Sequence, residues 1–341
     1  MINKLSLLSL IKRKRVIQVF WLPPLLLAIG LALLSGASSM VISSIVAISE
    51  KRRLRKSVLS FFLVAFSTSS AELSVAVNSI ILGTMDVSLG DILGSNITNI
   101  ALIVGASIIV ATVIRPYRRK ITIEEKEKKE FTTGLMLISI TLISLLYLQY
   151  ISQIIGVILL CMFLGYSYTL IRKGKEKEDN ASGNFKDKKI KKELMLFLAG
   201  MAGLLIGARL TIESTIDIAT YMGIPSSIVA ATLVAFGTSL PELNVHVKAA
   251  YKGHFEITLG GITGSCFFNS TIILGLLLVF TPFEVNLLVL SDLILFSVIS
   301  NLLLWFFIEN GKMGGREGLI LLVLYTVNVL SLLGIIVLRA H

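Results

Sequence analysis

Two stretches of this chain lie 170 residues apart, are nearly identical, and each carry a glutamate within an apolar region. VAFSTSSAELSV occupies 64–75, and VAFGTSLPELNV occupies 234–245. The match extends without a gap from 63–105 to 233–275, with roughly 19 of about 43 positions identical. Matches at polar positions are rare by chance in apolar sequence, where only Leu and Ile matches are common. The chain therefore contains a duplicated unit, and any fold must place the two copies in equivalent surroundings.

The composition places both copies in a membrane. Hydrophobic residues make up 55% of the 341 residues, only 16% are charged, and the mean hydropathy is +0.85. A soluble domain of this size needs a more polar surface. A spanning helix needs about 20 apolar residues. Ten stretches satisfy this requirement, at 22–48, 57–85, 89–114, 131–149, 151–171, 194–221, 225–250, 256–280, 285–309 and 317–339. We predict an all-α integral membrane protein with ten transmembrane helices, and a basic tail at 1–21 on the membrane surface.

The two copies lie five predicted spans apart, and this number fixes their relative orientation. Because five is odd, the second copy enters the membrane from the opposite side. We therefore predict two inverted five-helix repeats, at 22–171 and 194–341. The segment 172–193 joins them, and its Lys, Glu, Asn, Ser and Gly residues are typical of a flexible linker. Many secondary transporters have this architecture, with the substrate site near the bilayer midplane.

The basic residues predict the orientation in the cell membrane. They are concentrated in the loops 50–56, 115–130 and 172–193, which lie on one side of a ten-span topology. The positive-inside rule makes that side cytoplasmic and both termini extracellular. The basic tail at 1–21 argues for the opposite orientation, which an extra re-entrant element near it would produce. The net charge of +11 is thus a topology signal, so we expect no nucleic-acid partner. Cys161 and Cys266 lie inside predicted spans and predict no disulfide.

Each repeat contains two short polar segments within its predicted spans. The first reads STSSAE in one copy and GTSLPE in the other, and the second reads GSNITN and GSCFFN. In each segment a hydroxyl and a carboxylate or amide stand four positions apart, so they share one face of a helix. These pairs are Thr68/Glu72, Ser95/Asn99, Thr238/Glu242 and Ser265/Asn269. The duplication therefore predicts four oxygen-bearing helix faces related by a pseudo-twofold axis.

Glu72 and Glu242 need a positive partner at membrane depth. An ionised carboxylate in hydrocarbon costs several kcal/mol unless it is paired. The repeats place no Lys or Arg at a matching depth, whereas a cation from solution can pair with both carboxylates. Hard oxygen ligands suit Ca²⁺, Na⁺ or H⁺. Gly237 and Pro241 weaken the helix next to Glu242, which favours free carbonyls such as that of Ala235 as further ligands. Helix packing is the alternative reading for the hydroxyls, but it does not explain two symmetric glutamates.

At these residues the sequence resembles the calcium/cation antiporter superfamily, and most of all prokaryotic sodium/calcium exchangers. The two repeats of that family carry a G-T-S-x-P-E motif followed by G-S-N-x-x-N or G-S-N-x-x-D, and the resemblance covers nearly the whole chain. It implies that Glu72 and Glu242 are the main Ca²⁺ ligands, shared with Na⁺. It also implies oxygen ligands from Ala65, Thr68, Ser69, Ala235, Thr238, Ser239, Ser95, Asn99, Ser265 and Asn269. The implied mechanism is alternating access, with spans 22–48 and 194–221 sliding against a fixed core.

The sequence departs from the family pattern in both repeats. Ser67 replaces Gly and Ala71 replaces Pro, so we expect the first repeat to be less unwound than the second. Cys266 replaces Asn. Asn269 stands where many relatives have Asp, which predicts two core carboxylates rather than three. These differences bear on the number of ions exchanged and on proton sensitivity.

Two further polar residues allow two interpretations each. Asp91 lies one turn before Ser95 and either lines an access path or is a helix N-terminal residue favoured by the helix dipole. His246 follows Glu242 by four positions and either senses protons near the site or simply lines a wet cavity.

These features predict a secondary active antiporter that exchanges Ca²⁺ for Na⁺, with the bilayer and the transported cations as its partners. The sequence has no G-x-x-x-x-G-K-[ST] motif, so we expect an ion gradient to drive transport, with no cofactor and no requirement for an oligomer. The nearest alternative is a proton-coupled exchanger of Ca²⁺ or another cation. A passive cation channel is a further alternative, although channels usually build their filter on an oligomer axis. With three His and no nucleophile–base pattern, we do not expect an enzyme.

Overall fold

The computed structural model describes residues 21–41, 43–44, 47, 69–113, 121–122, 125–147, 152–175, 191–280 and 287–339. The described residues are helical apart from short turns and two strands of two residues each, β1 (Ile121–Thr122) and β2 (Lys312–Met313). These strands pair antiparallel, with Ile121 opposite Met313. The predicted all-α class is therefore confirmed, and β1 and β2 only join two connections at one end of the helices.

The helices follow the duplication. The first half has a helix at Trp21–Val41, α3 (Ser70–Leu82), α4 (Met85–Ile97), the π-helix η1 (Thr98–Val104), α5 (Gly105–Val113), α6 (Glu125–Tyr147) and α7 (Ser152–Lys175). The second half has α8 (Lys191–Met222), α9 (Ser226–Val229), the π-helix η2 (Ala230–Val234), α10 (Ala235–Thr238), α11 (Leu240–Lys252), α12 (Phe255–Phe268), the π-helix η3 (Asn269–Ile273), α13 (Leu274–Phe280), α14 (Leu287–Glu309) and α15 (Gly315–Arg339).

Six helical segments among the described residues are long and apolar enough to cross a membrane, and a bent pair, Ser226–Thr238 with Leu240–Lys252, makes a seventh. Three shorter apolar helices lie at Ser70–Leu82, Phe131–Leu145 and Gln153–Gly165. Each of these segments overlaps one of the ten predicted spans. A multi-pass membrane protein is thus supported, while the count of ten spans and the boundaries at 22–171, 172–193 and 194–341 stay predictions. The basic tail at 1–21 lies almost entirely outside the described residues.

Equivalent helices end in the same way in both halves. Gly83 follows α3 with φ 69°, and Gly253 follows α11 with φ 89°. This left-handed conformation closes a helix and is strained for residues with a side chain, which explains why the repeat has glycine at both positions. The next helices, α4 and α12, begin two residues later in both halves.

Equivalent helix crossings also use equivalent glycines. A Cβ built on Gly105 of α5 would lie 3.1 Å from the carbonyl oxygen of Gly318 in α15. A Cβ on its repeat partner, Gly275, would lie 3.1 Å from the carbonyl oxygen of Gly156 in α7. Small residues allow membrane helices to pack backbone against backbone. The third span of each half therefore packs against the last span of the other half, as a pseudo-twofold arrangement requires.

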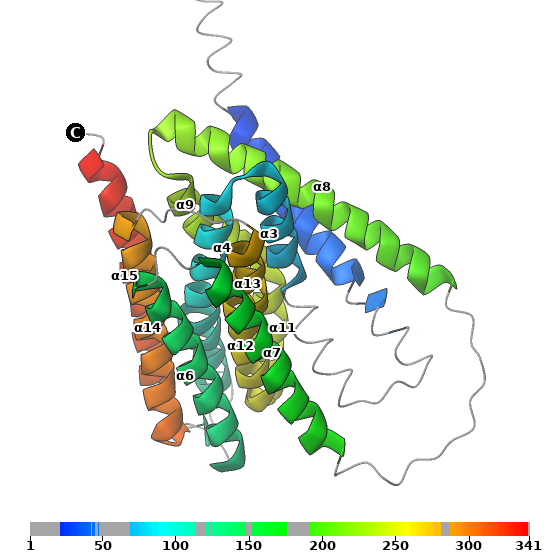
Figure 1. Cartoon of the computed structure of the whole chain (residues 1–341). Coiled ribbons are helices and arrows are strands. Elements are labelled where there is room, and N and C mark those ends of the chain that lie inside the picture. Colours follow the sequence, from blue (N-terminus) through cyan, green and yellow to red (C-terminus); the bar gives the residue numbers. More distant parts are fainter. Residues whose placement is uncertain are drawn as a thin grey trace, which may run out of the picture.

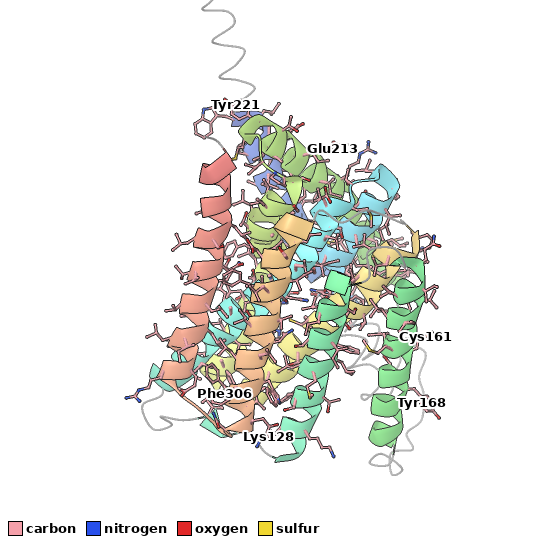
Figure 2. The ribbon with its side chains drawn as sticks, turned by 60° about the vertical axis from the view of Figure 1, so that its left-hand side comes forward. Lys128, Cys161, Tyr168, Glu213, Tyr221 and Phe306 are labelled. Atoms are coloured by element: carbon pink, nitrogen blue, oxygen red, sulfur yellow. The ribbon has the colours of Figure 1, made fainter. Side chains whose placement is uncertain are left out.

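The helix Trp21–Val41 and α8 lie together on one side of the helices, where they run obliquely to the others (Figure 1). They approach closely at Gly30 and Gly207, because a Cβ on either glycine would lie 3.1 Å from the carbonyl oxygen of the other. The core helices α4, α5, α12 and α13 form a central group that α6, α7, α14 and α15 cover (Figure 1). Side chains on the outer faces, among them Cys161 and Tyr168 of α7, point away from this centre (Figure 2).

Among the described residues, ion pairs at the periphery include two between neighbouring helix positions or helices. Lys128 of α6 pairs with Glu309 of α14 at 3.2 Å, near the end of the helices where Figure 2 labels Lys128. Arg209 and Glu213 pair at 2.9 Å along the exposed face of α8. Neither pair involves a predicted site residue. Both cysteines are free, as expected, with Cys161 exposed and Cys266 buried.

Candidate cation site

Both glutamates occupy the first turn of a helix, at equivalent places in the two halves. Glu72 lies in the first turn of α3 after Ser69, and Glu242 lies in the first turn of α11 after Ser239. Both side chains are 1% exposed. A helix N-terminus carries a partial positive charge, which favours a carboxylate there. The local fold thus lowers the cost of burying each carboxylate without giving it a formal countercharge.

The helix that precedes Glu242 is broken, as Gly237 and Pro241 predict. It passes through the π-helix η2, and the axis then bends by 48° between α10 and α11. Pro241 has no N–H, so the carbonyl of Gly237 lacks its usual helical donor. The carbonyl of Ala235 accepts the Ser239 N–H at 3.2 Å and the Thr238 hydroxyl at 3.3 Å. The equivalent residues before Ser69 lie outside the described part of the chain, so the expected contrast with Ser67 and Ala71 stays a prediction.

The second polar segment of each half lies where an α-helix widens into a π-helix. Asn99 is the second residue of η1, and Asn269 is the first residue of η3. Ser95 and Ser265 lie one turn earlier, and all four side chains are at most 1% exposed. Short π-helical segments often occur at functional sites because they redirect side chains and loosen the hydrogen-bond ladder. The sequence pattern did not predict these widened turns.

Several buried polar atoms without a hydrogen-bond partner belong to predicted site residues. Within the described chain these atoms include both carboxylate oxygens of Glu72 and of Glu242. They also include the hydroxyls of Ser69 and Ser239, both amide atoms of Asn99 and Oδ1 of Asn269. Buried polar groups are normally satisfied, and each exception needs an explanation. At the predicted site the exceptions fall on three repeat-related pairs of residues and are mainly oxygen atoms, which is the chemistry of a hard cation ligand.

Several contacts join the two halves at this place. The Thr238 hydroxyl donates to Asp91 Oδ1 at 3.1 Å and lies 3.4 Å from the Ser95 hydroxyl. The Asn96 amide donates to the Ser270 hydroxyl at 2.9 Å, and the Asn269 amide donates to Asn96 Oδ1 at 3.4 Å. Glu242 also lies within Coulombic range of Glu72. The four predicted faces therefore meet in one region between the halves.

Some predicted ligands do not take part in these observations. Ala65 and Thr68 lie outside the described residues. Ser265 is fully buried. The Ala235 carbonyl is not free as expected, because it accepts two hydrogen bonds from the turn that follows it. Within the described ranges no three His, Cys, Asp or Glu side chains form a metal-binding group on their own. A cation here would need hydroxyl, amide or carbonyl oxygens in addition to the carboxylates.

Asp91 belongs to this region, which sequence reasoning did not establish. It is the seventh residue of α4 and is fully buried, so the interpretation as a helix N-terminal residue is wrong. Asp86, in the first turn, occupies that place instead. With Asp91 beside Thr238, a third carboxylate lies in this region, and the expectation of two core carboxylate ligands stays a prediction. Its four-residue spacing from Ser95 and eight-residue spacing from Asn99 could have revealed the shared face.

His246 is buried against α12 rather than exposed in a wet cavity. Its side chain is 2% exposed, and neither ring nitrogen has a hydrogen-bond partner among the described residues. A Cβ built on Gly261 would lie 2.2 Å from Cε1 of the imidazole, so the ring fills the space above this glycine. The backbone carbonyl of His246 accepts the Thr258 hydroxyl at 3.0 Å, which ties α11 to α12.

Comparison with known proteins agrees with this geometry. A family model described as sodium/calcium exchanger protein matches residues 22–172 and 192–334. The sodium/calcium exchanger MaX1 of Methanosarcina acetivorans is 28% identical over 348 residues, covering 88% of this chain and 95% of MaX1. An uncharacterized membrane protein of Methanocaldococcus jannaschii is 29% identical, covering 89% and 96%. The putative antiporter CaxA of Alkalimonas amylolytica is 27% identical, covering 74% and 79%.

Solved structures lead to the same family. The sodium-calcium exchanger NCX_Mj soaked with Na⁺ and Sr²⁺ superposes with a TM-score of 0.62 at 26% identity, covering 91% of this chain and 98% of that one. The same exchanger soaked without Na⁺ and Ca²⁺ gives a TM-score of 0.59. Because the family model matches most of the chain in two blocks, one in each half, the protein belongs to the sodium/calcium exchanger family.

Proposed function

We propose that this protein is a secondary active antiporter that exchanges Ca²⁺ for Na⁺ at a single site between its two halves. The observation that carries the proposal is the pair Glu72 and Glu242, buried at repeat-related helix N-termini with all four carboxylate oxygens unpartnered among the described residues. A cation removes the cost of two buried negative charges. Two carboxylates neutralise one Ca²⁺ and can hold monovalent ions in its place, which is what exchange at one site requires.

The ligand set for this cation would be the predicted one, with the charge of Asp91 close to it. Glu72 and Glu242 would bind Ca²⁺ directly, with oxygens from Ser69, Ser239, Asn99 and Asn269 completing the shell. Ca²⁺ takes about 6–8 oxygen ligands, so the carboxylates do not suffice alone. The names of MaX1 and NCX_Mj as sodium/calcium exchangers support the choice of ions. The predicted contributions of Ala65, Thr68, Ala235 and Ser265 stay part of the proposal.

The moving element would be the helix Trp21–Val41 together with α8. These helices pack on each other through Gly30, Gly200, Gly203 and Gly207. Their polar ties to α3 include a Ser38–Ser70 hydroxyl contact at 2.8 Å and an Asn78 amide bond to the Leu205 carbonyl at 3.4 Å. Because these two helices pack closely on each other at glycines, they can slide together along α3. Such sliding would open the site to alternate sides of the membrane.

Proteoliposomes test the proposal and its coupling ion. The purified protein is reconstituted with internal Na⁺, choline or an acidic buffer, and uptake of ⁴⁵Ca²⁺ is followed after dilution. We expect uptake only with internal Na⁺, with saturation in external Ca²⁺. Uptake driven by the pH gradient alone would replace Na⁺ by H⁺ as the coupling ion. Unsaturable uptake without any counter-ion would indicate a channel and overturn the proposal.

Labelling of intact cells tests the orientation. The linker 172–193 is expected on the cytoplasmic side and both termini outside. Cysteine labelling at an introduced residue in the linker, with an impermeant reagent on intact cells, should give no signal, whereas a residue introduced near the C-terminus should be labelled. The reverse result would place the N-terminal tail inside.

A further inference from the structure

Asp91 adds a negative charge that the duplication does not predict. Its repeat partner is Gly261, whereas Glu72, Ser95 and Asn99 each have an identical partner in the second half. Asp91 is fully buried in the middle of α4. Its Oδ1 accepts the Thr238 hydroxyl at 3.1 Å and the Ser95 hydroxyl at 3.5 Å, and its Oδ2 has no partner in the described chain.

The second half uses the equivalent space differently. The pair Ala76 and Asp91 in the first half corresponds to His246 and Gly261 in the second. The imidazole of His246 fills the space above Gly261, so no acidic side chain fits there without displacing it. The third carboxylate can therefore come from only one side of the pseudo-twofold axis, and it reaches across to Thr238 of the other half.

The contact with Thr238 determines where that hydroxyl points its lone pairs. An ionised carboxylate is only an acceptor, so the Thr238 proton must lie toward Asp91. The oxygen lone pairs of Thr238 then remain available to a cation held by Glu242, one turn further along the chain. Without Asp91, this proton would turn to another acceptor, such as the Ala235 carbonyl at 3.3 Å, and the hydroxyl oxygen would then point in another direction.

The charge of Asp91 also affects which ion is bound. Glu242 is within Coulombic range of both Glu72 and Asp91, so three negative charges act on one region. The attraction between a carboxylate and an ion is proportional to the charge of the ion, so an extra carboxylate favours a divalent ion over a monovalent one. Asn269, where many relatives have a carboxylate, adds no charge here.

We propose that Asp91 is a specificity-determining positioning residue, which orients the Thr238 hydroxyl and supplies the third negative charge, so that Ca²⁺ competes effectively with Na⁺. The inference rests on the proposed function and deepens it, because it names the residue that sets the preference between the two ions. Asp91 acts through Thr238 and through its charge, not as a ligand that the site requires.

Asp91→Asn separates the charge from the hydrogen bond, because the amide oxygen can still accept from Thr238. The apparent affinity for Ca²⁺ and the inhibition constant for Na⁺ are measured by equilibrium binding of ⁴⁵Ca²⁺ to detergent-purified protein. We expect the Ca²⁺ affinity to fall about tenfold and the Na⁺ constant to change less than about threefold. Asp86→Asn, an exposed carboxylate on the same helix, is the matched control and should change neither. The inference would be overturned if Asp91→Asn weakened the binding of Ca²⁺ and Na⁺ equally, or if Asp86→Asn had the same effects as Asp91→Asn.

A double-mutant cycle tests the action through Thr238. Asp91→Ala and Thr238→Val each remove one side of the hydrogen bond, and the double variant removes both. We expect the effects on Ca²⁺ affinity to be clearly less than additive, because either change alone already disturbs the same hydroxyl. Thr238→Ser should restore most of the affinity. Strictly additive effects would show that Asp91 does not act through Thr238.

Two readouts keep this inference separate from the proposed function. Wild-type protein that neither binds nor transports Ca²⁺ would sink the proposed function itself. If the wild type binds Ca²⁺ as proposed but Asp91→Asn leaves the ratio of Ca²⁺ to Na⁺ constants unchanged, only the role of Asp91 is contradicted. If Asp91→Asn does not fold, the single variant Asn269→Asp tests the charge argument instead. Its fourth negative charge should raise the affinity for Ca²⁺ relative to that for Na⁺. An unchanged ratio of the two affinities would contradict the argument.

Discussion

The two halves of this protein share a backbone plan but differ in the side chains that fill it. Helices α3 and α11 both end at a left-handed glycine, and each is preceded by a serine and carries a buried glutamate in its first turn. One difference between the halves is paired, with Ala76 and Asp91 in the first half and His246 and Gly261 in the second. The duplication thus fixes where oxygen atoms meet, and its later divergence decides how much charge they carry.

The largest effect on transport is expected at the two glutamates, which both halves share. Glu72→Gln and Glu242→Gln should each abolish Na⁺-driven ⁴⁵Ca²⁺ uptake, because either change removes one of the two carboxylates proposed to bind Ca²⁺ directly. Both should leave folding intact, since each replaces an unpartnered buried carboxylate with a neutral group of the same shape. Uptake and thermal unfolding in detergent are measured together. Substantial transport by either variant would break the equivalence of the halves.

The glycine crossings should show equal and large effects on stability. A Cβ on Gly156 would lie 2.7 Å from the carbonyl oxygen of Gly275, and such a backbone contact has no room to give way. At the other crossing, a Cβ on Gly318 would lie 2.9 Å from the carbonyl oxygen of Gly105. We expect Gly156→Ala and Gly318→Ala each to destabilise the protein by about 1–3 kcal/mol, seen as a lower midpoint of thermal unfolding. Gly165→Ala, on the same helix as Gly156 but without close neighbours among the described residues, is the control. It should be neutral or slightly stabilising, because alanine favours a helix. A large effect at one crossing only would contradict the pseudo-twofold packing.

For Gly261 and His246, which differ between the halves, we predict that a second substitution restores stability lost through the first. Gly261→Ala would place a Cβ about where the His246 ring lies, and we expect roughly 1–2 kcal/mol of destabilisation, since a side chain can move where a backbone cannot. Adding His246→Ala removes the clash and gives the second half the small residue that Ala76 provides in the first. The double variant should therefore unfold at a higher temperature than Gly261→Ala alone. A further drop in stability would show that the two residues do not occupy one shared space.

The smallest effect is expected at the periphery. Lys128 and Glu309 form an ion pair whose side chains are 15% and 43% exposed, and Thr132 donates to the same carboxylate at 3.1 Å. Solvent-exposed pairs contribute about 0–1 kcal/mol. Lys128→Met should therefore change thermal stability only slightly and leave ⁴⁵Ca²⁺ uptake unchanged. A marked loss of uptake would mean that this end of α6 and α14 takes part in transport.

The sequence could predict the parts of the site that depend on periodicity and duplication. Residues four apart share a helix face, so Ser95 and Asn99 could be placed together, and the bend near Pro241 follows from a missing N–H. The π-helical turns at Thr98 and Asn269 depend on packing between helices, and the sequence carries no signal for them. The position of Asp91 depends on how α4 crosses η2. There a Cβ on Gly94 would lie 2.3 Å from the Ala231 carbonyl oxygen, and that close approach brings Asp91 to Thr238.

The central claim is that both halves hold one cation together, and the stoichiometry of binding tests it most directly. Equilibrium ⁴⁵Ca²⁺ binding to the detergent-purified wild type should give one ion per chain, displaced by Na⁺. In Glu72→Gln and in Glu242→Gln alike, binding should be lost rather than halved, because the two carboxylates serve the same ion. Two ions per chain, with one lost in each variant, would show that each half has a site of its own and would contradict the claim.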